Sequence, residues 1–329
     1  MKEIYYYIIT LAAVFAVTAL STRYLIPILK SKKMGQKILE IGPRWHKSKE
    51  GTPTMGGLAF VFATMLVCAV MGGIAFFENT LTNLLPLVLT LLFALANALV
   101  GMIDDLTKFK KSQNEGLTPL QKLLLQTVFA AAYIALMQIY GYIDTAFYIP
   151  FIGITIEFGF TYYFFAMILI LGIVNCANLT DGLDGLASTV ALIIGFFFAA
   201  VAMRTESISL VLVSAAISGS ALGFLVYNFY PARIFMGDTG SLFFGSLTVG
   251  CAFMINNPII IIITGIVYVI EGISVVLQVG CYKLTRKRIF KMAPIHHHFE
   301  KCGWSEIRVV IAAAVVTLLF SAAAWFGIE

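Results

Sequence analysis

Long apolar runs separated by short polar segments recur along the whole chain. Runs of about 17–25 apolar residues are long enough to cross the hydrocarbon core of a bilayer as helices. The pattern predicts ten membrane-spanning helices, with a short eighth span and a tight turn at Asn256, Asn257 and Pro258 before the ninth. The predicted spans are 4–29, 56–77, 80–102, 119–140, 159–177, 185–203, 208–228, 240–255, 258–281 and 307–327.

The composition agrees with this pattern and excludes a soluble protein. Of 329 residues, 60% are hydrophobic and 12% are charged, whereas about 25% are charged in an ordinary soluble domain. The five cysteines show neither paired nor metal-ligand spacing and are interpreted as small apolar residues. No linker or repeat interrupts the array, so we expect residues 1–329 to form a single domain, an all-α polytopic membrane protein.

The basic residues predict the orientation of this array. Of the 22 Lys and Arg residues, all except Lys2 and Arg204 fall in segments that ten spans would place on one side of the membrane. The positive-inside rule makes that side cytoplasmic and leaves both termini external.

Five polar stretches lie on the predicted cytoplasmic side. They are GTPTMGG (51–57), GMIDDLTK (101–108), NCANLTDGLDG (175–185), YNFYPARIFMGDTGS (227–241) and MAPIHHHFEKCGW (292–304). The opposite loops carry only scattered single acidic residues. Polar stretches that converge on one membrane face predict an active site there.

The acidic residues of these stretches suggest metal or phosphate chemistry. Asp104 and Asp105 follow the predicted third span, at a helix C-terminus where the macrodipole disfavours anions. They are either a solvated pair neutralised by nearby lysines or carboxylates that manage a metal, a proton or a cationic group. Asp238 precedes the eighth span and is a candidate N-cap and ligand.

The stretch NLTDGLDG adds a polar face at helical spacing. Asn175, Asn178, Asp181 and Asp184 are separated by three residues each, so they drift slowly around one side of a helix. Helix capping explains one such residue but not four.

The histidine triplet 296–298 stands beside a basic run and lacks the spacing of a zinc site. Histidines in a basic setting suit phosphate oxygens, and the aromatic Phe235 suits a planar base. Together the stretches predict phosphoryl transfer from a soluble phosphorylated donor to a lipid acceptor. The chain has no P-loop motif, which argues against a nucleoside-triphosphate motor.

These five motifs, in this order, resemble those of the polyprenyl-phosphate N-acetylhexosamine-1-phosphate transferases from about residue 44 to residue 308. HKSKEGTPTMGG and APIHHHFE are most similar to the members that use a muramyl-pentapeptide donor. The resemblance implies transfer of phospho-MurNAc-pentapeptide from UDP-MurNAc-pentapeptide to undecaprenyl phosphate, with Mg²⁺ as cofactor. The products would be lipid I and UMP, for peptidoglycan synthesis in a bacterial inner membrane. A homodimer is also implied, and no nucleic-acid partner is expected.

The resemblance also assigns residues to roles. The implied catalytic residues are Asp104, Asp105 and Asp238, with His296 and His297 near the phosphates or the sugar. Asp238 and Asn178 are the implied magnesium ligands. The uridine end would contact Asn178, Asp181, Gly182, Asp184 and Phe235. Further implied substrate contacts are Lys47, Thr52, Lys122, Asn228, Ser241 and Gln278.

Three alternatives remain open from the sequence. The lipid phosphate is largely dianionic at neutral pH, since its second pKa is about 6, which favours direct attack over double displacement through Asp238. The donor could be UDP-GlcNAc, as in a sibling transferase. A transporter is the most distant alternative. It draws on Glu271, the only acidic residue well inside a predicted span, which we expect to be paired within the bundle or to line a lipid groove.

Overall fold

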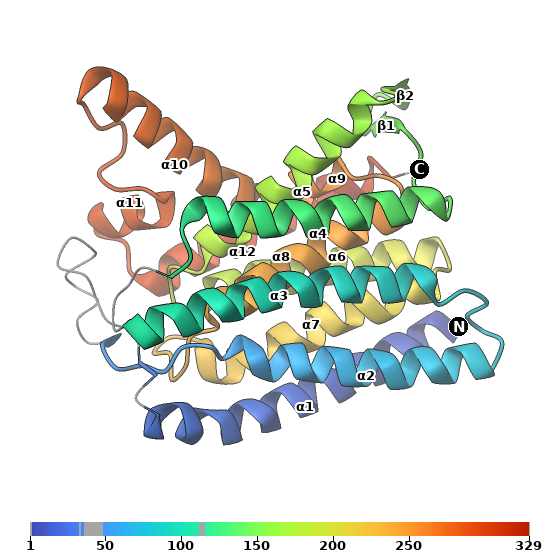
Figure 1. Ribbon diagram of the computed structural model, residues 1–329, viewed down its shortest axis with the longest axis horizontal. Coiled ribbons are helices and arrows are strands. Elements are labelled where there is room, and N and C mark those ends of the chain that lie inside the picture. The colour runs from blue at the N-terminus through green and yellow to red at the C-terminus, as the bar shows by residue number, and fades with distance from the viewer. Residues whose placement is uncertain (1, 33, 36–48, 112–115, 329) are drawn as a thin grey trace.

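The computed structural model describes residues 2–32, 34, 35, 49–111 and 116–328, and long helices dominate it (Figure 1). In these ranges, nine helices are long and apolar enough to cross a membrane, which confirms a polytopic helical membrane protein. They are α1 (Lys2–Ser31), α2 (Gly57–Phe77), α3 (Leu85–Lys111), α4 (Pro119–Ile139), α5 (Thr161–Thr180), α6 (Leu186–Arg204), α7 (Ile208–Asn228), α10 (Ile266–Thr285) and α12 (Glu306–Trp325).

Helix α8 (Gly237–Met254) corresponds to the predicted short eighth span but is not among these nine. Its first turns carry Asp238, Thr239 and Ser241, and small residues recur along it, so it falls short of the apolar character of the nine candidate spans. Every residue from Thr239 to Phe253 is buried, and the helix contacts α2, α3 and α5. Other helices therefore surround α8 where lipid would surround an outer span. The count of ten spans stays a prediction.

Helix α3 extends beyond the predicted end at residue 102 and reaches Lys111. The expectation that Asp104 and Asp105 follow the helix was therefore wrong, because both lie inside it. Their charges do not end the helix because partners compensate them. Lys108 lies one turn after Asp104, with its Nζ 2.6 Å from Asp104 Oδ2, and α8 supplies partners to Asp105.

Two further features differ from the predicted all-α array of ten spans. Strands β1 (Ala146–Ile149) and β2 (Ile154–Glu157) form an antiparallel hairpin between α4 and α5, with Ala146 opposite Glu157. The predicted span 258–281 is divided by Gly265 into α9 (Ile260–Thr264) and α10. The chain turns before α9 at Asn256, whose φ is 51°, as the sequence predicted.

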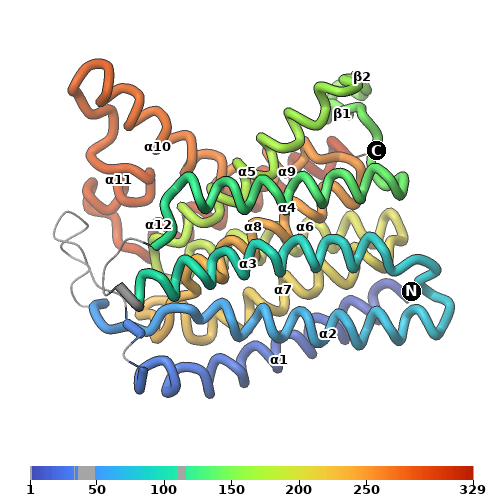
Figure 2. The backbone as a smooth tube through the Cα atoms, in the orientation of Figure 1, coloured from blue at the N-terminus to red at the C-terminus, as the bar shows by residue number. Residues whose placement is uncertain are grey.

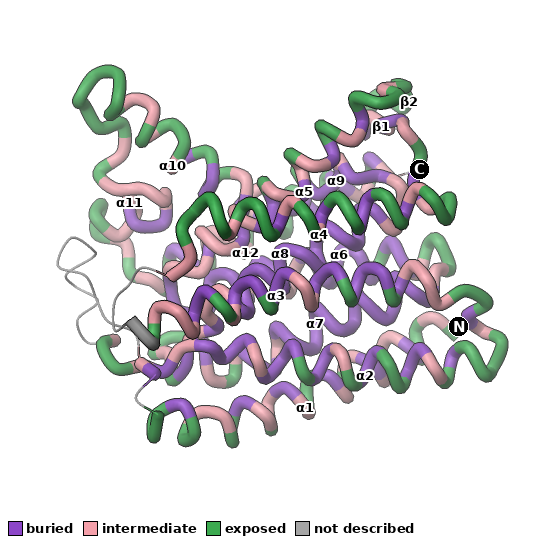
Figure 3. Tube along the Cα trace, in the orientation of Figure 1, coloured by how far each residue is buried: buried purple, intermediate pink, exposed green. Residues whose placement is uncertain are grey.

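The burial pattern separates an inner from an outer set of helices (Figure 3). Helix α7 is the most enclosed of the nine candidate spans and packs against α1, α2 and α6. Helices α1, α4 and α12 expose many apolar side chains, as lipid-facing helices do. Helix α10 leans away from the bundle, and the short α11 (Ile295–Lys301) folds back beneath it (Figure 1).

Both chain ends lie at one end of the bundle (Figure 2). Helices α2, α4, α6, α8 and α11 begin at the other end, as the backbone trace shows (Figure 2). The starts of these helices carry or border the five polar stretches, so the helix order brings the stretches to one end of the molecule.

Candidate active site

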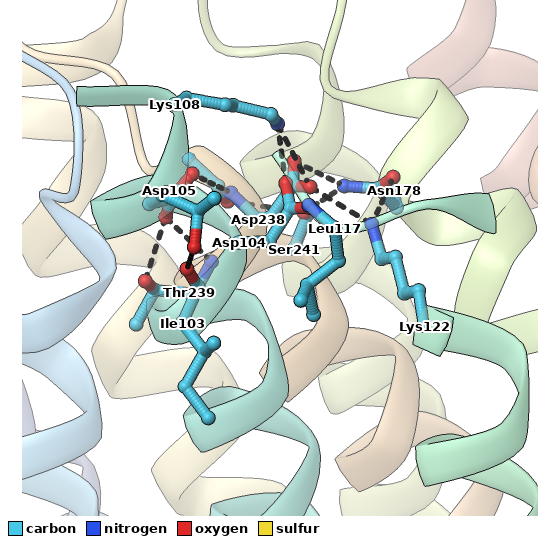
Figure 4. Close-up of polar contacts among 12 residues, drawn as sticks. Ile103, Asp104, Asp105, Lys108, Leu117, Lys122, Asn178, Asp238, Thr239 and Ser241 are labelled. Atoms are coloured by element: carbon cyan, nitrogen blue, oxygen red, sulfur yellow. Dashed lines mark hydrogen bonds and ion pairs between the residues drawn. The ribbon is translucent and has the colours of Figure 1, made fainter. Parts of the chain in front are cut away.

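Three carboxylates form the centre of the polar end. Asp104 and Asp105 come from the last turns of α3 and Asp238 from the first turn of α8 (Figure 4). One oxygen atom from each can be chosen so that all three lie within 4.8 Å of one another, close enough to hold one metal ion. Asp104 and Asp105 are buried and Asp238 is half-buried.

Asp105 holds the start of α8. Its Oδ1 accepts the main-chain N–H of Asp238 at 3.1 Å, and its Oδ2 accepts the main-chain N–H of Thr239 at 3.0 Å. The Thr239 hydroxyl donates to Oδ2 as well, at 2.7 Å. Free N–H groups at a helix start need acceptors, and an anion there is favoured by the macrodipole. Asp105 therefore acts as an N-cap supplied by another helix.

Gly237 makes this cap possible. Its φ is 70°, a conformation that L side chains rarely adopt, and a Cβ at this position would stand 2.7 Å from Asp105 Oδ2. The glycine thus turns the chain into α8 while leaving room for the Asp105 carboxylate.

Two lysines and one amide surround the oxygens of Asp238. Lys108 Nζ lies 3.0 Å and Lys122 Nζ 2.8 Å from Asp238 Oδ2. Asn178 Nδ2 donates to Asp238 Oδ1 at 2.9 Å and to Ser241 Oγ at 2.7 Å, while its Oδ1 accepts from Lys122 at 3.3 Å. Four helices, α3, α4, α5 and α8, thus meet at one carboxylate (Figure 4).

The local sequence places Lys122 in the first turn of α4. Thr118 is the N-cap and forms a capping box with Gln121, and Pro119 opens the helix. The connection before α4 is also attached to the cluster, because Asp104 Oδ1 accepts the main-chain N–H of Leu117 at 2.8 Å. Lys122 thus reaches the cluster from the start of α4, and Leu117 reaches it from the connection before that helix.

Asp181 ends α5 beside the cluster and is half-buried. Burial raises its pKa well above the ordinary range of an aspartate, and the charges of Asp238, Asp105 and Asp184 raise it further. The carboxyl of Asp181 therefore lies in a field that disfavours another negative charge and favours a hydrogen-bond donor or a cation.

Asp184 is engaged in a network that the sequence did not predict. Lys49 Nζ lies 2.7 Å from Asp184 Oδ1 and 2.5 Å from Glu306 Oε2. Asp184 Oδ2 also accepts the main-chain N–H of Ala232 at 2.8 Å. This network joins the connection before α2, the α5–α6 turn, the loop before α8 and the start of α12.

Asn228 and Thr52 lie in the same loop assembly. The Asn228 side chain accepts from Gly185 N–H at 3.2 Å and donates to the Ile234 carbonyl at 3.0 Å. Thr52 precedes Pro53, whose carbonyl accepts the main-chain N–H of Phe235 at 2.8 Å. The Phe235 side chain itself is half-buried. The Asn228 side chain thus links the α5–α6 turn to the loop before α8. Phe235 is held by a hydrogen bond from its main chain to that of Pro53.

His296 and His297 start α11 and are both buried. His296 Nδ1 lies 3.0 Å from Glu271 Oε2 of α10, and His297 Nδ1 lies 2.6 Å from Glu300 Oε2. The expectation that Glu271 is paired inside the protein is confirmed. A Cβ at Gly182 would stand 2.2 Å from His296 Nε2, so this ring packs on the α5–α6 turn.

Both polar atoms of the Gln278 amide bind the loop after α10. Its Oε1 accepts the main-chain N–H groups of Ile289 and Phe290 at 3.1 and 2.9 Å, and its Nε2 donates to the Phe290 carbonyl at 3.2 Å. Lys47 lies outside the described residues.

The structure thus brings together Asp104, Asp105, Lys122, Asn178, Asp238 and Ser241, with Asp181 beside them and Gly182 against His296. Sequence reasoning did not assign site roles to Lys49, Lys108, Thr239 or Glu306. Lys108 could have been found from its position one turn after Asp104. The partners of Lys49 are 135 and 257 residues away, and no local pattern marks such pairs.

Comparison with known proteins gives matches over most of the chain. Residues 87–256 match the family model described as glycosyl transferase family 4, and residues 49–61 match signature 1 of the phospho-N-acetylmuramoyl-pentapeptide-transferases. The phospho-N-acetylmuramoyl-pentapeptide-transferase of Clostridium perfringens (strain 13 / Type A) is 42% identical over 306 residues, 93% of this chain and 93% of that protein.

Two other relatives with the same name agree with this match. The protein of Clostridium novyi (strain NT) is 40% identical and covers 93% of this chain and 91% of its own length. That of Clostridium acetobutylicum is 42% identical and covers 92% of this chain and 93% of its own length. The chain therefore belongs to the phospho-N-acetylmuramoyl-pentapeptide-transferases, within glycosyl transferase family 4.

Proposed function

We propose that this transferase moves phospho-MurNAc-pentapeptide from UDP-MurNAc-pentapeptide to undecaprenyl phosphate and releases UMP and lipid I. The observation that carries the proposal is the cluster of Asp104, Asp105 and Asp238 with two lysines, in a chain 42% identical to relatives named for this transfer. We propose the cytoplasmic face of a bacterial inner membrane as its place, from the distribution of Lys and Arg.

The donor set at the cluster fits Mg²⁺. Magnesium prefers oxygen ligands and is commonly held by one or two carboxylates together with substrate phosphates. Asp104 and Asp238 would hold it, with the Asn178 amide oxygen as a third ligand. Asp105 is a weaker candidate because both of its oxygens accept main-chain N–H groups of α8, whereas Asp104 accepts a main-chain N–H only with Oδ1. When bound, Mg²⁺ supplies neutralisation of pyrophosphate charge.

The lysines would handle the remaining charge. Lys108 and Lys122 already contact Asp238, so both stand where the phosphates of a bound donor would meet that carboxylate. Their ammonium groups would offset the charge that develops as the phosphoanhydride bond breaks. Thr239 and Ser241 would keep the start of α8, and with it Asp238, in place.

The uridine end would lie along the α5–α6 turn, residues 181–185, which we call the substrate wall. Asp181 accepts a hydrogen bond from an N–H or O–H donor better than it tolerates another anion, which suits a base or a ribose. Phe235 would stack on uracil. The Asp184–Lys49 pair and Asn228 would shape this wall from behind. His296, which packs on Gly182 of this turn, and His297 beside it would contact the phosphates or the sugar.

Direct attack is the mechanism we propose. The lipid phosphate oxygen attacks the phosphorus that bears the sugar, the phosphoanhydride bond breaks, and UMP leaves. The acceptor is largely dianionic at neutral pH, so it needs positioning more than it needs a base. A phosphorylated aspartate trapped in the absence of the acceptor would refute this choice.

The test is UMP release by the purified full chain with UDP-MurNAc-pentapeptide, undecaprenyl phosphate and Mg²⁺. We expect release that requires all three components and falls by about 10²–10³-fold in Asp238→Asn. Asp144→Asn is the matched control, because Asp144 pairs with Asn256 beside the β-hairpin, away from the cluster. Release with UDP-GlcNAc instead would change the donor. Silence with both donors would refute the proposal, and solute flux without UMP release would favour a transporter.

A further inference from the structure

Glu271 is a buried carboxyl group in the first half of α10 and is 3% exposed. A carboxylate inside a membrane-spanning helix is costly unless it is paired, and such residues often have a functional reason. Its oxygen Oε2 faces two nitrogen atoms of His296, the ring Nδ1 at 3.0 Å and the main-chain N–H at 3.4 Å. The function proposed above gives Glu271 no role.

This pair sets the hydrogen-bonding character of the His296 ring. The main-chain N–H can only donate, so Glu271 Oε2 is an acceptor, and it accepts from the ring Nδ1–H in the same way. With Nδ1 committed to Glu271, Nε2 is the remaining ring nitrogen. Among the residues that the structure describes, Nε2 has no hydrogen-bond partner, and the side chain is 1% exposed.

The free nitrogen is directed toward the proposed substrate wall. A Cβ at Gly182 would stand 2.2 Å from Nε2, so this nitrogen lies against the glycine. Gly182 follows Asp181 in the turn between α5 and α6. A buried ring nitrogen without a partner normally has one in the functional state, since leaving it unpaired is unfavourable.

The pair also attaches α11 to α10. Glu271 and His296 are 25 residues apart, and the chain between them runs out along α10 and returns. The contact therefore holds the histidine segment against the first half of α10, near α5, although the chain reaches this segment from the far end of α10 (Figure 1).

We propose that Glu271 is a positioning residue: it holds the His296 ring with Nδ1 as donor, so that Nε2 contacts the nucleotide donor at the Asp181–Gly182 turn. This inference rests on the function proposed above. A carboxylate that orients a histidine through its other nitrogen is a recurring arrangement at metal sites, where its loss commonly weakens metal affinity or activity by about 10–100-fold.

The test compares Glu271→Gln with Glu271→Leu. The Gln amide oxygen can still accept from Nδ1–H and from the main-chain N–H, so this variant should keep the ring orientation. Leu removes the acceptor and is comfortable in an apolar helix. Ser274→Ala is the matched control, because Ser274 is buried in the same helix and its hydroxyl donates only to the Glu271 carbonyl, at 2.7 Å.

The first readout is the ¹⁵N spectrum of the histidine rings in the full chain without substrate. The chain has four histidines, and a His296→Gln variant assigns the signals of His296. We expect a protonated Nδ1 in the parent, in Glu271→Gln and in Ser274→Ala, and loss of that signature in Glu271→Leu. An unchanged His296 spectrum in Glu271→Leu would overturn the inference.

The second readout is the kinetics of UMP release. For Glu271→Leu we expect the KM for the nucleotide donor to rise by roughly tenfold with a smaller change in kcat, and near-parent values for Glu271→Gln and Ser274→Ala. Equal falls of activity and thermal midpoint in both Glu271 variants would mean a purely structural role and refute the proposal. Parent protein that shows the ring signature but no UMP release would refute the proposed function while leaving the orientation of His296 established.

Discussion

The α3–α8 corner and the α10–α11 arm hold their functional side chains in different ways. At the corner, Asp105 binds main-chain N–H groups of α8, and Asp238 is shared among four helices. In the arm, His296 depends on the Glu271 carboxylate, and the connecting loop depends on Gln278. Helix α8 is buried almost throughout, whereas α10 exposes apolar side chains such as Val276 and Leu284.

The two regions therefore hold their functional side chains by different kinds of contact. Main-chain N–H groups and packed helices fix the carboxylates, so a change there must disturb the bundle itself. Single side-chain pairs fix the histidines, so a change there can move them while the bundle stays intact. We therefore expect variants at the corner to lower turnover and stability together when they touch the helix start, and variants in the arm to affect substrate contact alone.

The largest effect is expected at the central carboxylates. Asp238→Asn should lower UMP release by about 10²–10³-fold, because it removes the carboxylate that would hold Mg²⁺ and that Lys108 and Lys122 contact. Asp105→Asn should lower both turnover and the thermal midpoint, since an amide nitrogen would face the N–H groups that Asp105 now caps. Turnover and unfolding measured on the same preparations check this contrast. A thermal midpoint of Asp105→Asn equal to that of the parent would contradict the capping role.

A pair of glycine variants compares the corner with the arm directly. Gly237→Ala forces a left-handed backbone on alanine, at a cost of about 1–2 kcal/mol, and brings its Cβ within 2.7 Å of Asp105 Oδ2. Gly280→Ala in α10 meets nothing within 4 Å and should stabilise that helix by about 0.5–1 kcal/mol. Thermal unfolding should therefore show opposite shifts, with loss of turnover only for Gly237→Ala. Shifts of the same sign would argue against this view of the corner.

A smaller effect is expected in the loop network behind the substrate wall. Lys49→Met leaves the buried Asp184 and the neighbouring Glu306 without this cation, which should cost roughly 1–3 kcal/mol of stability. Turnover should fall less than in Asp238→Asn, because Lys49 contacts the wall from behind. The exposed Lys287 of the arm offers a control, Lys287→Met, in which both quantities should stay near the parent values.

The smallest effect is a dependence on pH. The pKa of Asp181 is raised in the folded protein by burial and by neighbouring carboxylates, so its ionisation opposes folding as the pH rises above the ordinary value of about 3.9. Asp181→Asn should therefore raise the thermal midpoint at neutral pH in buffer with a chelator. The gain should shrink as the pH falls, when Asp181 becomes neutral in both states. A gain that is equal at all pH values would mean that charge is not its cause.

The sequence predicted the helices well because apolar runs alone define them, but it could not predict where α3 ends. That end depends on partners such as Lys108 and the start of α8, which are tertiary contacts. The β-hairpin at 146–157 was missed for a different reason, since each strand is only 4 residues long. Short strands carry little periodic signal.

The motifs indicated which residues meet at one end, and Asp104, Asp238 and Asn178 do meet there. They did not indicate what each residue contacts. Asp105 was grouped with its neighbour as a reactive carboxylate, yet its oxygens face N–H groups of another helix. Asp184 and Gln278 were grouped with substrate contacts, yet their polar atoms already bind lysine or main-chain groups. Such distinctions depend on distances that no spacing in the chain encodes.

The enclosed position of α8 also bears on how the chain is inserted into a membrane. A segment of 18 residues that opens with Gly237, Asp238 and Thr239 gains little from entering lipid alone. Its small residues suit close helix packing instead, and its neighbours α2, α3 and α5 are all synthesised before it. Most of the helices that contact α8 therefore precede it in synthesis, and Asp238 is the last of the three clustered carboxylates to be made.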